Sequence, residues 1–132
     1  MVQNTAARLV LRVSRRDHIT PSLKQLHWLP IKQRAIYKIL LLAYKALNGM
    51  APEYISDLVE LYVPTRALRS SSEFRLSIPS YATKFYGKRS LAYAAAALWN
   101  TLPIHIRRAS STSMFKSQLK THLFIQHFNQ SV

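Results

Sequence analysis

Apolar positions recur at helical spacing through residues 31–48. These positions lie three or four residues apart, as the face of one helix requires. They are Ile36, Ile39, Leu40, Ala43 and Leu47. Gly49 follows directly, and glycine is the residue that most readily ends a helix in a left-handed turn. The pattern predicts a long amphipathic helix over residues 31–48 that buries its apolar face.

Helix formers and capping residues predict shorter helices on both sides. Residues 6–13 favour a helix that Asn4 or Thr5 caps, and Thr20 before Pro21 predicts a second helix over residues 21–27. Pro52 predicts the start of another helix, which extends to about residue 61. Residues 94–100 favour a helix, although a strand remains an alternative near them. Three serines and a threonine at 110–113 precede an apolar stripe that predicts a terminal helix to about residue 128.

Residues 74–78 alternate strictly between apolar and polar side chains, the period of a half-buried strand. We expect a partner strand within residues 84–93, with Gly87 at a turn or bulge. The predicted fold class is therefore mainly α, a helical domain with a small antiparallel β-hairpin. One domain covers residues 1–132: a helical part with a basic first helix (1–61), a loop with short strands (62–93) and C-terminal helices (94–128).

Two tryptophans, each followed within a few residues by a proline, predict packed corners of the core. The expected core residues are Trp28, Trp99, Leu40, Leu47, Phe115 and Leu119. No cysteine is present, which fits a reducing compartment, and the longest apolar run is too short to span a bilayer. We therefore expect an intracellular protein, nuclear or cytoplasmic.

The chemistry expected of an enzyme acting alone is missing from the sequence. The five acids supply no adjacent pair for metal-assisted polymerisation, and the five histidines match no compact ligand spacing. No serine lies in a Gly-x-Ser-x-Gly elbow, and two glycines are too few for a phosphate-binding loop. We expect no catalytic residue, no metal and no cofactor.

The charge balance points to a polyanionic partner, because 19 lysines and arginines face 5 acids, a net charge of +14. Arginine grips phosphate through two hydrogen bonds, so clustered arginines favour nucleic-acid binding. The candidate phosphate contacts are Arg8, Arg12, Arg16, Arg34, Lys38, Lys45, Arg66, Arg69, Lys88, Arg89, Arg107 and Arg108. For any one of them, a solvated surface position is an equal alternative.

Ordered blocks through nearly the whole chain carry a family resemblance. They cover residues 17–21, 23–30, 37–40, 44–47 leading to 49–54, 66–71, 86–90, 98–103 and 115–124. On these blocks the chain resembles the C-terminal region of LINE-type (non-LTR) retrotransposon reverse transcriptases. That region lies at the thumb and beyond, where template and primer are held. The palm, which carries the polymerase aspartates, and the endonuclease are absent from this chain.

The resemblance and the charge together imply a non-catalytic domain that grips RNA, DNA or an RNA–DNA hybrid. One alternative is an interaction module that docks on a reverse transcriptase palm or another acidic partner. A basic helix that binds a membrane surface is another. The chain also fits a retroelement remnant without a function of its own.

Overall fold

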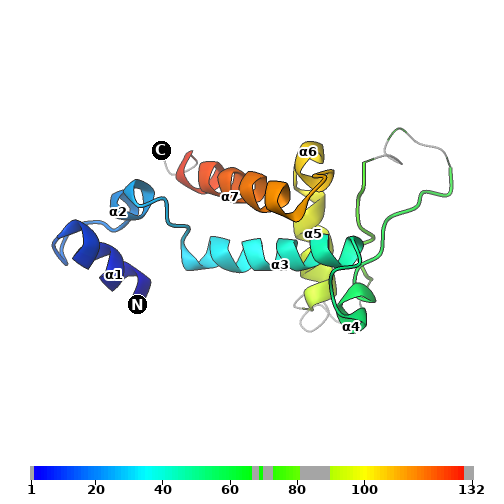
Figure 1. Cartoon of the computed structure of the whole chain (residues 1–132), viewed down its shortest axis with the longest axis horizontal. Helices are drawn as coiled ribbons and strands as arrows, with labels where there is room; N and C mark the ends of the chain where they lie inside the picture. The colour runs from blue at the N-terminus through cyan, green and yellow to red at the C-terminus, as the bar shows by residue number, and fades with distance from the viewer. Residues whose placement is uncertain (1, 67–68, 70–72, 81–89, 130–132) are drawn as a thin grey trace.

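A computed structural model describes residues 2–66, 69, 73–80 and 90–129. Its helices are α1 (Val2–Leu11), α2 (Thr20–Gln25), α3 (Ile31–Leu47), α4 (Glu53–Ser56), α5 (Leu91–Asn100), α6 (Ile104–Arg107) and α7 (Thr112–Asn129). The long α3 lies at the centre and packs against both α5 and α7 (Figure 1). The mainly helical fold predicted from the sequence is confirmed. In the described part of the chain, no helix is long and apolar enough to cross a membrane.

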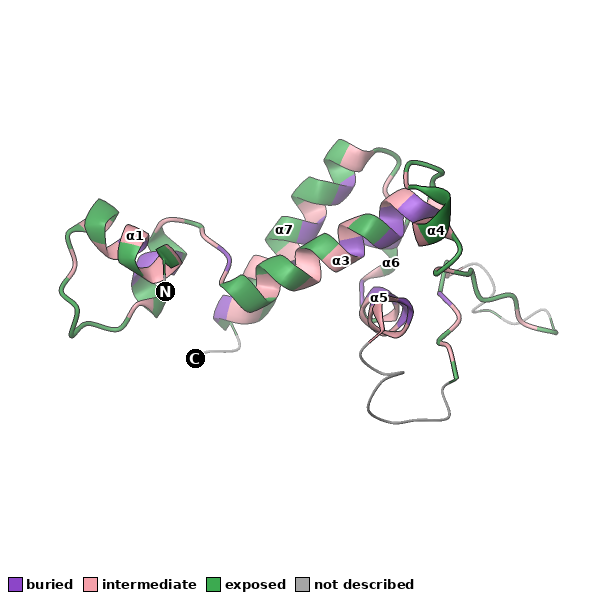
Figure 2. Ribbon diagram, turned by 90° about the horizontal axis from the view of Figure 1, so that it is seen from below, coloured by how far each residue is buried: buried purple, intermediate pink, exposed green. Residues whose placement is uncertain are grey.

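The main core lies where α3, α5 and α7 meet, and buried residues recur along these helices (Figure 2). At its centre the Phe115 ring stacks on Tyr44, with ring centroids 4.2 Å apart, and on Trp99, at 5.8 Å. Leu40 and Leu119 are also fully buried here, whereas Leu47 is half-buried and packs against the edge of the cluster. Trp99, Leu40, Phe115 and Leu119 thus lie in the expected core.

A second, smaller cluster joins the N-terminal helices to the end of α7. Ala7 of α1, Leu23 of α2 and Phe128 of α7 are buried there. Trp28 is half-buried and packs against this cluster, so the two tryptophans stabilise different parts of the fold. The side-chain amide of Gln3 also donates to the backbone oxygen of Leu29 at 2.7 Å, tying α1 to the chain before α3.

Among the described residues, three helices end in the same left-handed turn, and one of these turns uses glycine. Gly49 has φ +70°, and Met50 N donates to the Lys45 oxygen at 2.8 Å, the bond expected of a Schellman motif. The predicted end of the long helix is therefore confirmed. Arg12 and His27 adopt φ +54° after α1 and α2, with equivalent bonds of 3.0 and 2.9 Å. A side chain in this conformation costs on the order of 1–2 kcal/mol.

The predicted β-hairpin is wrong for the described residues. Residues 74–78 form one isolated antiparallel bridge, Leu76 with Leu61, rather than a strand. Tyr62 N donates to the Arg75 oxygen and Ser77 N to the Glu60 oxygen, each at 2.8 Å. Of the expected partner, residues 84–89 lie outside the described residues and the rest begins α5. The alternating segment thus pairs with residues 60–62.

Several helix boundaries also differ from prediction. The first helix begins at Val2, so Asn4 and Thr5 lie inside it, and it ends before Arg12. The fourth is a single turn, and a further turn, α6, follows Pro103 where none was predicted. Ser111 caps α7 as expected from the serine-rich stretch, because its hydroxyl accepts from Met114 N at 3.1 Å.

Candidate nucleic-acid interface

A basic cleft, below called the α1 cleft, lies between α1 and the turn that follows it. Three arginines line it, Arg8, Arg12 and Arg15, together with Asn4 and Thr5 and two apolar residues. Its volume is about 630 Å³, and no acid is among its lining residues. The Arg8 guanidinium donates to the Ser14 oxygen, which holds the turn against the helix. The arrangement presents several guanidinium groups to an anion without a competing carboxylate.

The left-handed turn at Arg12 changes the predicted arrangement of these arginines. Arg8, Arg12 and Arg16 are four residues apart, which predicts that they share one helix face, but the helix ends at Leu11. Arg16 is therefore an exposed loop residue, and Arg15 lines the cleft instead. A spacing pattern that assumes an unbroken helix does not place Arg15 beside Arg8 and Arg12.

Other predicted contacts are spread along the surface. Arg34 and Lys38 are exposed on α3, four residues apart and hence on one face, whereas Lys45 is half-buried. Arg66 and Arg69 are exposed in the segment that follows α4. Lys88 and Arg89 lie outside the described residues.

Arg107, the last residue of α6, and Arg108, which follows it, were both predicted as phosphate contacts but lie in different environments. The Arg107 side chain is 8% exposed, and its guanidinium donates to the Glu73 backbone oxygen. Its Nε is buried without a hydrogen-bond partner among the described residues. Arg108 is exposed and its guanidinium lies over the Phe74 ring, 5.3 Å from the centroid, a cation–π contact. The sequence predicted both as phosphate contacts and gave no sign of this burial.

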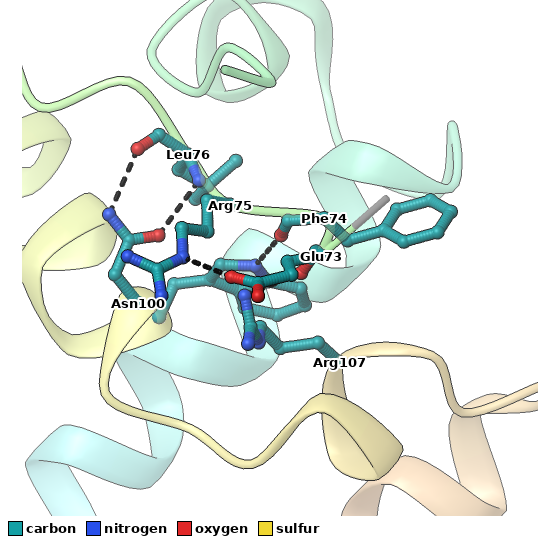
Figure 3. Close-up of polar contacts among 7 residues, drawn as sticks. Glu73, Phe74, Arg75, Leu76, Asn100 and Arg107 are labelled. Atoms are coloured by element: carbon teal, nitrogen blue, oxygen red, sulfur yellow. Dashed lines mark hydrogen bonds and ion pairs between the residues drawn. The ribbon is translucent and has the colours of Figure 1, made fainter. Parts of the chain in front are cut away.

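Segment 73–76 is held against α5 by side-chain hydrogen bonds (Figure 3). Trp99 Nε1 donates to the Phe74 oxygen at 2.8 Å. The Asn100 amide accepts from Leu76 N at 2.8 Å and donates to the Leu76 oxygen at 3.0 Å. These bonds fix the backbone that places Phe74 and Arg75 beside α6.

An open cavity of about 470 Å³ lies between this segment, α6 and the end of α3. Its lining combines aromatic and apolar side chains with two guanidinium groups. The lining residues are Tyr44, Leu47, Asn48, Leu61, Phe74, Trp99, Arg107, Arg108 and Ala109. Below, this cavity is called the α6 pocket. Cavities of this size accommodate small organic ligands.

The electrostatics of the α6 pocket favour an anion. Burial and the neighbouring Arg75 both lower the pKa of Arg107, and Glu73 offsets only part of this effect. Glu73 also pairs with Arg75 at 2.8 Å in a partly exposed ion pair, and such pairs contribute little. Arg75 and Arg107 both extend toward Glu73 (Figure 3). Arg107 therefore lies near one carboxylate, Glu73, and two other guanidiniums, Arg75 and Arg108.

The sequence did not indicate Phe74, which lines the pocket, or Arg75, which pairs with Glu73 beside it, because both were assigned to a predicted strand. Phe74 adopts φ +51°, which is rare for a bulky residue, and the residue is 48% exposed. Nothing in the local sequence signals that conformation. Among the described residues, no three His, Asp or Glu side chains gather as a metal site.

No protein family, curated protein or solved structure matches this chain.

Proposed function

We propose that this chain is a non-catalytic nucleic-acid-binding domain that grips RNA or an RNA–DNA hybrid through phosphate contacts. The observation that carries the proposal is the pair of arginine-lined hollows, the α1 cleft and the α6 pocket beside the end of α3. Even if every acid formed an ion pair, fourteen positive charges would remain. Phosphates supply the counter-charge that the chain itself lacks.

The proposed role is that of the thumb and post-palm part of a LINE-type reverse transcriptase, which the sequence blocks resemble. Such a part holds template and primer while another domain performs the chemistry. The protein would then act inside the cell, in the nucleus or the cytoplasm, with nucleic acid and a polymerase palm as partners.

The test is fluorescence anisotropy of the full chain with labelled RNA, single-stranded DNA, duplex DNA and an RNA–DNA hybrid across a salt series. If about five phosphates are engaged, log K falls with log salt at a slope near −3.5 for single strands and −4.5 for duplex DNA. Binding that does not change with salt would contradict the phosphate mechanism.

Matched charge variants locate the contact. Arg12→Gln with Arg15→Gln removes two charges from the α1 cleft, whereas Lys116→Gln with Lys120→Gln removes two exposed charges from α7. We expect the first pair to make the slope of log K against log salt shallower by about 1.4–1.8, the change expected for the loss of two phosphate contacts. The second pair should leave this slope nearly unchanged. Equal effects would show that only total charge matters.

Protein docking is a second candidate function, favoured by one observation. Residues 58–63 expose several apolar side chains, among them Leu61 at 45%, Tyr62 at 46% and Val63 at 81%. An apolar run of this kind fits an interface with a polymerase core or another partner. Self-association in sedimentation velocity together with binding of a hydrophobic dye would support docking. A monomer that binds neither dye nor nucleic acid would leave the retroelement-remnant interpretation.

A further inference from the structure

The α6 pocket differs from an ordinary basic surface because it combines a buried cation with an apolar wall. Arg107 is more than nine-tenths buried, its Nε lacks a partner among the described residues, and its guanidinium lines the hollow. A buried charge without full hydrogen bonding is costly unless an anion or other partner compensates it. Glu73 Oε2 is paired with Arg75, whereas the Arg107 guanidinium donates to the Glu73 backbone oxygen.

The rest of the lining is suited to a planar, apolar group. Leu47 and Leu61 provide aliphatic surface, and Phe74, a residue that is about half exposed, provides an aromatic ring. Aromatic side chains beside cations are how proteins bind unstacked bases of single strands. A ring held beside two guanidiniums thus offers surfaces for the base and for the phosphate of one nucleotide.

We propose that the α6 pocket binds a single unpaired nucleotide of a bound strand, with its base against Phe74 and its phosphate on Arg107 and Arg108. This inference rests on the proposed function and adds to it a preference for single-stranded over fully paired polymer. A base within a duplex is paired and stacked, so it cannot enter the pocket without flipping. The volume of the pocket, about 470 Å³, lies in the range of small-ligand sites.

The backbone of Phe74 supports this assignment. Its positive φ is maintained by the hydrogen bond from Trp99 to the Phe74 oxygen and by the Asn100 bonds to Leu76. Strained residues held by their surroundings in this way are concentrated at binding and catalytic sites. The surrounding structure therefore holds the ring beside the arginines before any ligand arrives.

The experiment compares a 12-nucleotide single-stranded RNA with the same RNA in a blunt duplex, by anisotropy at one salt concentration. The readout is the ratio of the two Kd values for the wild-type chain, Phe74→Leu, Arg108→Gln and the charge control Arg34→Gln. Circular dichroism confirms that each variant is folded. Phe74→Leu keeps apolar volume and removes the aromatic face, while Arg34 is exposed on α3, outside the pocket lining.

We expect the wild-type chain to prefer the single strand, and both pocket variants to reduce that preference about tenfold, as loss of one stacked base does. Arg34→Gln should weaken both polymers and keep the wild-type ratio. If the pocket variants also keep that ratio, the pocket does not bind a nucleotide, although phosphate binding elsewhere would stand.

If the wild-type chain binds neither polymer, the proposed function fails, and uridine monophosphate then tests the pocket alone. Trp99 lines the pocket, so its fluorescence reports occupancy. Saturable quenching by the monophosphate that Phe74→Leu abolishes, with none from uridine or inorganic phosphate, supports a free nucleotide as the occupant. No saturable response overturns the inference.

Discussion

The side-chain amide of Asn100 hydrogen-bonds both backbone groups of Leu76, accepting from its N–H at 2.8 Å and donating to its carbonyl at 3.0 Å. A neighbouring strand would make the same two bonds, but here they come from the end of helix α5. Leu76 is 2% exposed, so without Asn100 these groups would lie close to the core without partners. This contact therefore holds the segment that carries Phe74 and Arg75.

Asn100→Ala should lower the free energy of unfolding by about 2–4 kcal/mol, because it removes two hydrogen bonds and leaves buried backbone groups unpaired. Asn100→Asp retains the acceptor and loses the donor, so its cost should be smaller. Urea unfolding followed by circular dichroism measures both, and amide exchange at Leu76 should accelerate. A loss below about 0.5 kcal/mol for the alanine variant would contradict the contact.

The two tryptophans should differ in their contributions to stability. Trp99 is 1% exposed, stacks on Phe115 and donates a hydrogen bond, so Trp99→Ala should cost about 3–5 kcal/mol. Trp28 is half-buried on the smaller cluster, and we expect Trp28→Ala to cost about half as much. Chemical unfolding by circular dichroism compares them, and equal losses would show that the smaller cluster is as important as the main core.

Local sequence pattern predicted those elements whose cause is local. The apolar spacing of α3, its end at Gly49 and the serine cap of α7 were all readable, because each depends on residues a few positions apart. The alternation in residues 74–78 was real, but its pairing partners were distant. They are residues 60–62 and the Asn100 amide. No periodicity identifies a side chain 24 residues away as the hydrogen-bond partner.

The sequence predicted Arg107 and Arg108 as equivalent phosphate contacts, but the structure gives them different degrees of burial. Net charge and paired arginines predicted an anion partner without indicating which guanidinium is buried. Arg107 nevertheless is buried, because α6 packs against α7 and the Arg107 guanidinium donates to the Glu73 backbone oxygen. Burial depends on how distant elements pack, so Arg107 and Arg108, adjacent in sequence, could not be distinguished from sequence alone.

Arg12 should show a conflict between stability and binding. Its φ of +54° is strained for arginine and relaxed for glycine, so Arg12→Gly should raise the free energy of unfolding by about 1 kcal/mol. The same change removes a guanidinium from the α1 cleft and should weaken nucleic-acid binding. Arg12→Ala is the control, since it loses the charge but keeps the strained turn. In anisotropy, both variants should therefore bind nucleic acid more weakly than wild type. In thermal unfolding, only Arg12→Gly should have a higher melting temperature.

Stability should fall in mildly acidic solution because of His122. Burial and then the nearby His105 lower the pKa of His122 in the folded chain below 6.5. The unfolded chain then takes up a proton first, so stability is fully present above about pH 6.5 and declines as the pH falls toward the folded pKa. His122→Gln should flatten the melting temperature between pH 7 and 5 relative to wild type. An unchanged pH profile would exclude His122 as the cause.

Affinity should depend on strand length if one strand reaches both arginine-lined hollows. The α6 pocket lies at the C-terminal end of α3, and α1 lies beyond its N-terminal end (Figure 1), so the length of α3, about 25 Å for 17 residues at 1.5 Å each, sets the scale of the span between the two hollows. At 3.4 Å per stacked nucleotide, about seven nucleotides are needed to span that distance. Single strands of four to six nucleotides should bind one hollow. Strands of eight to twelve nucleotides gain a second, tethered contact, so affinity should rise in a sharp step between these lengths.

Arg12→Gln with Arg15→Gln should remove this step in affinity, while short strands still bind the α6 pocket. A smooth increase with length, or a step that survives the double variant, would show that the two hollows do not engage one strand.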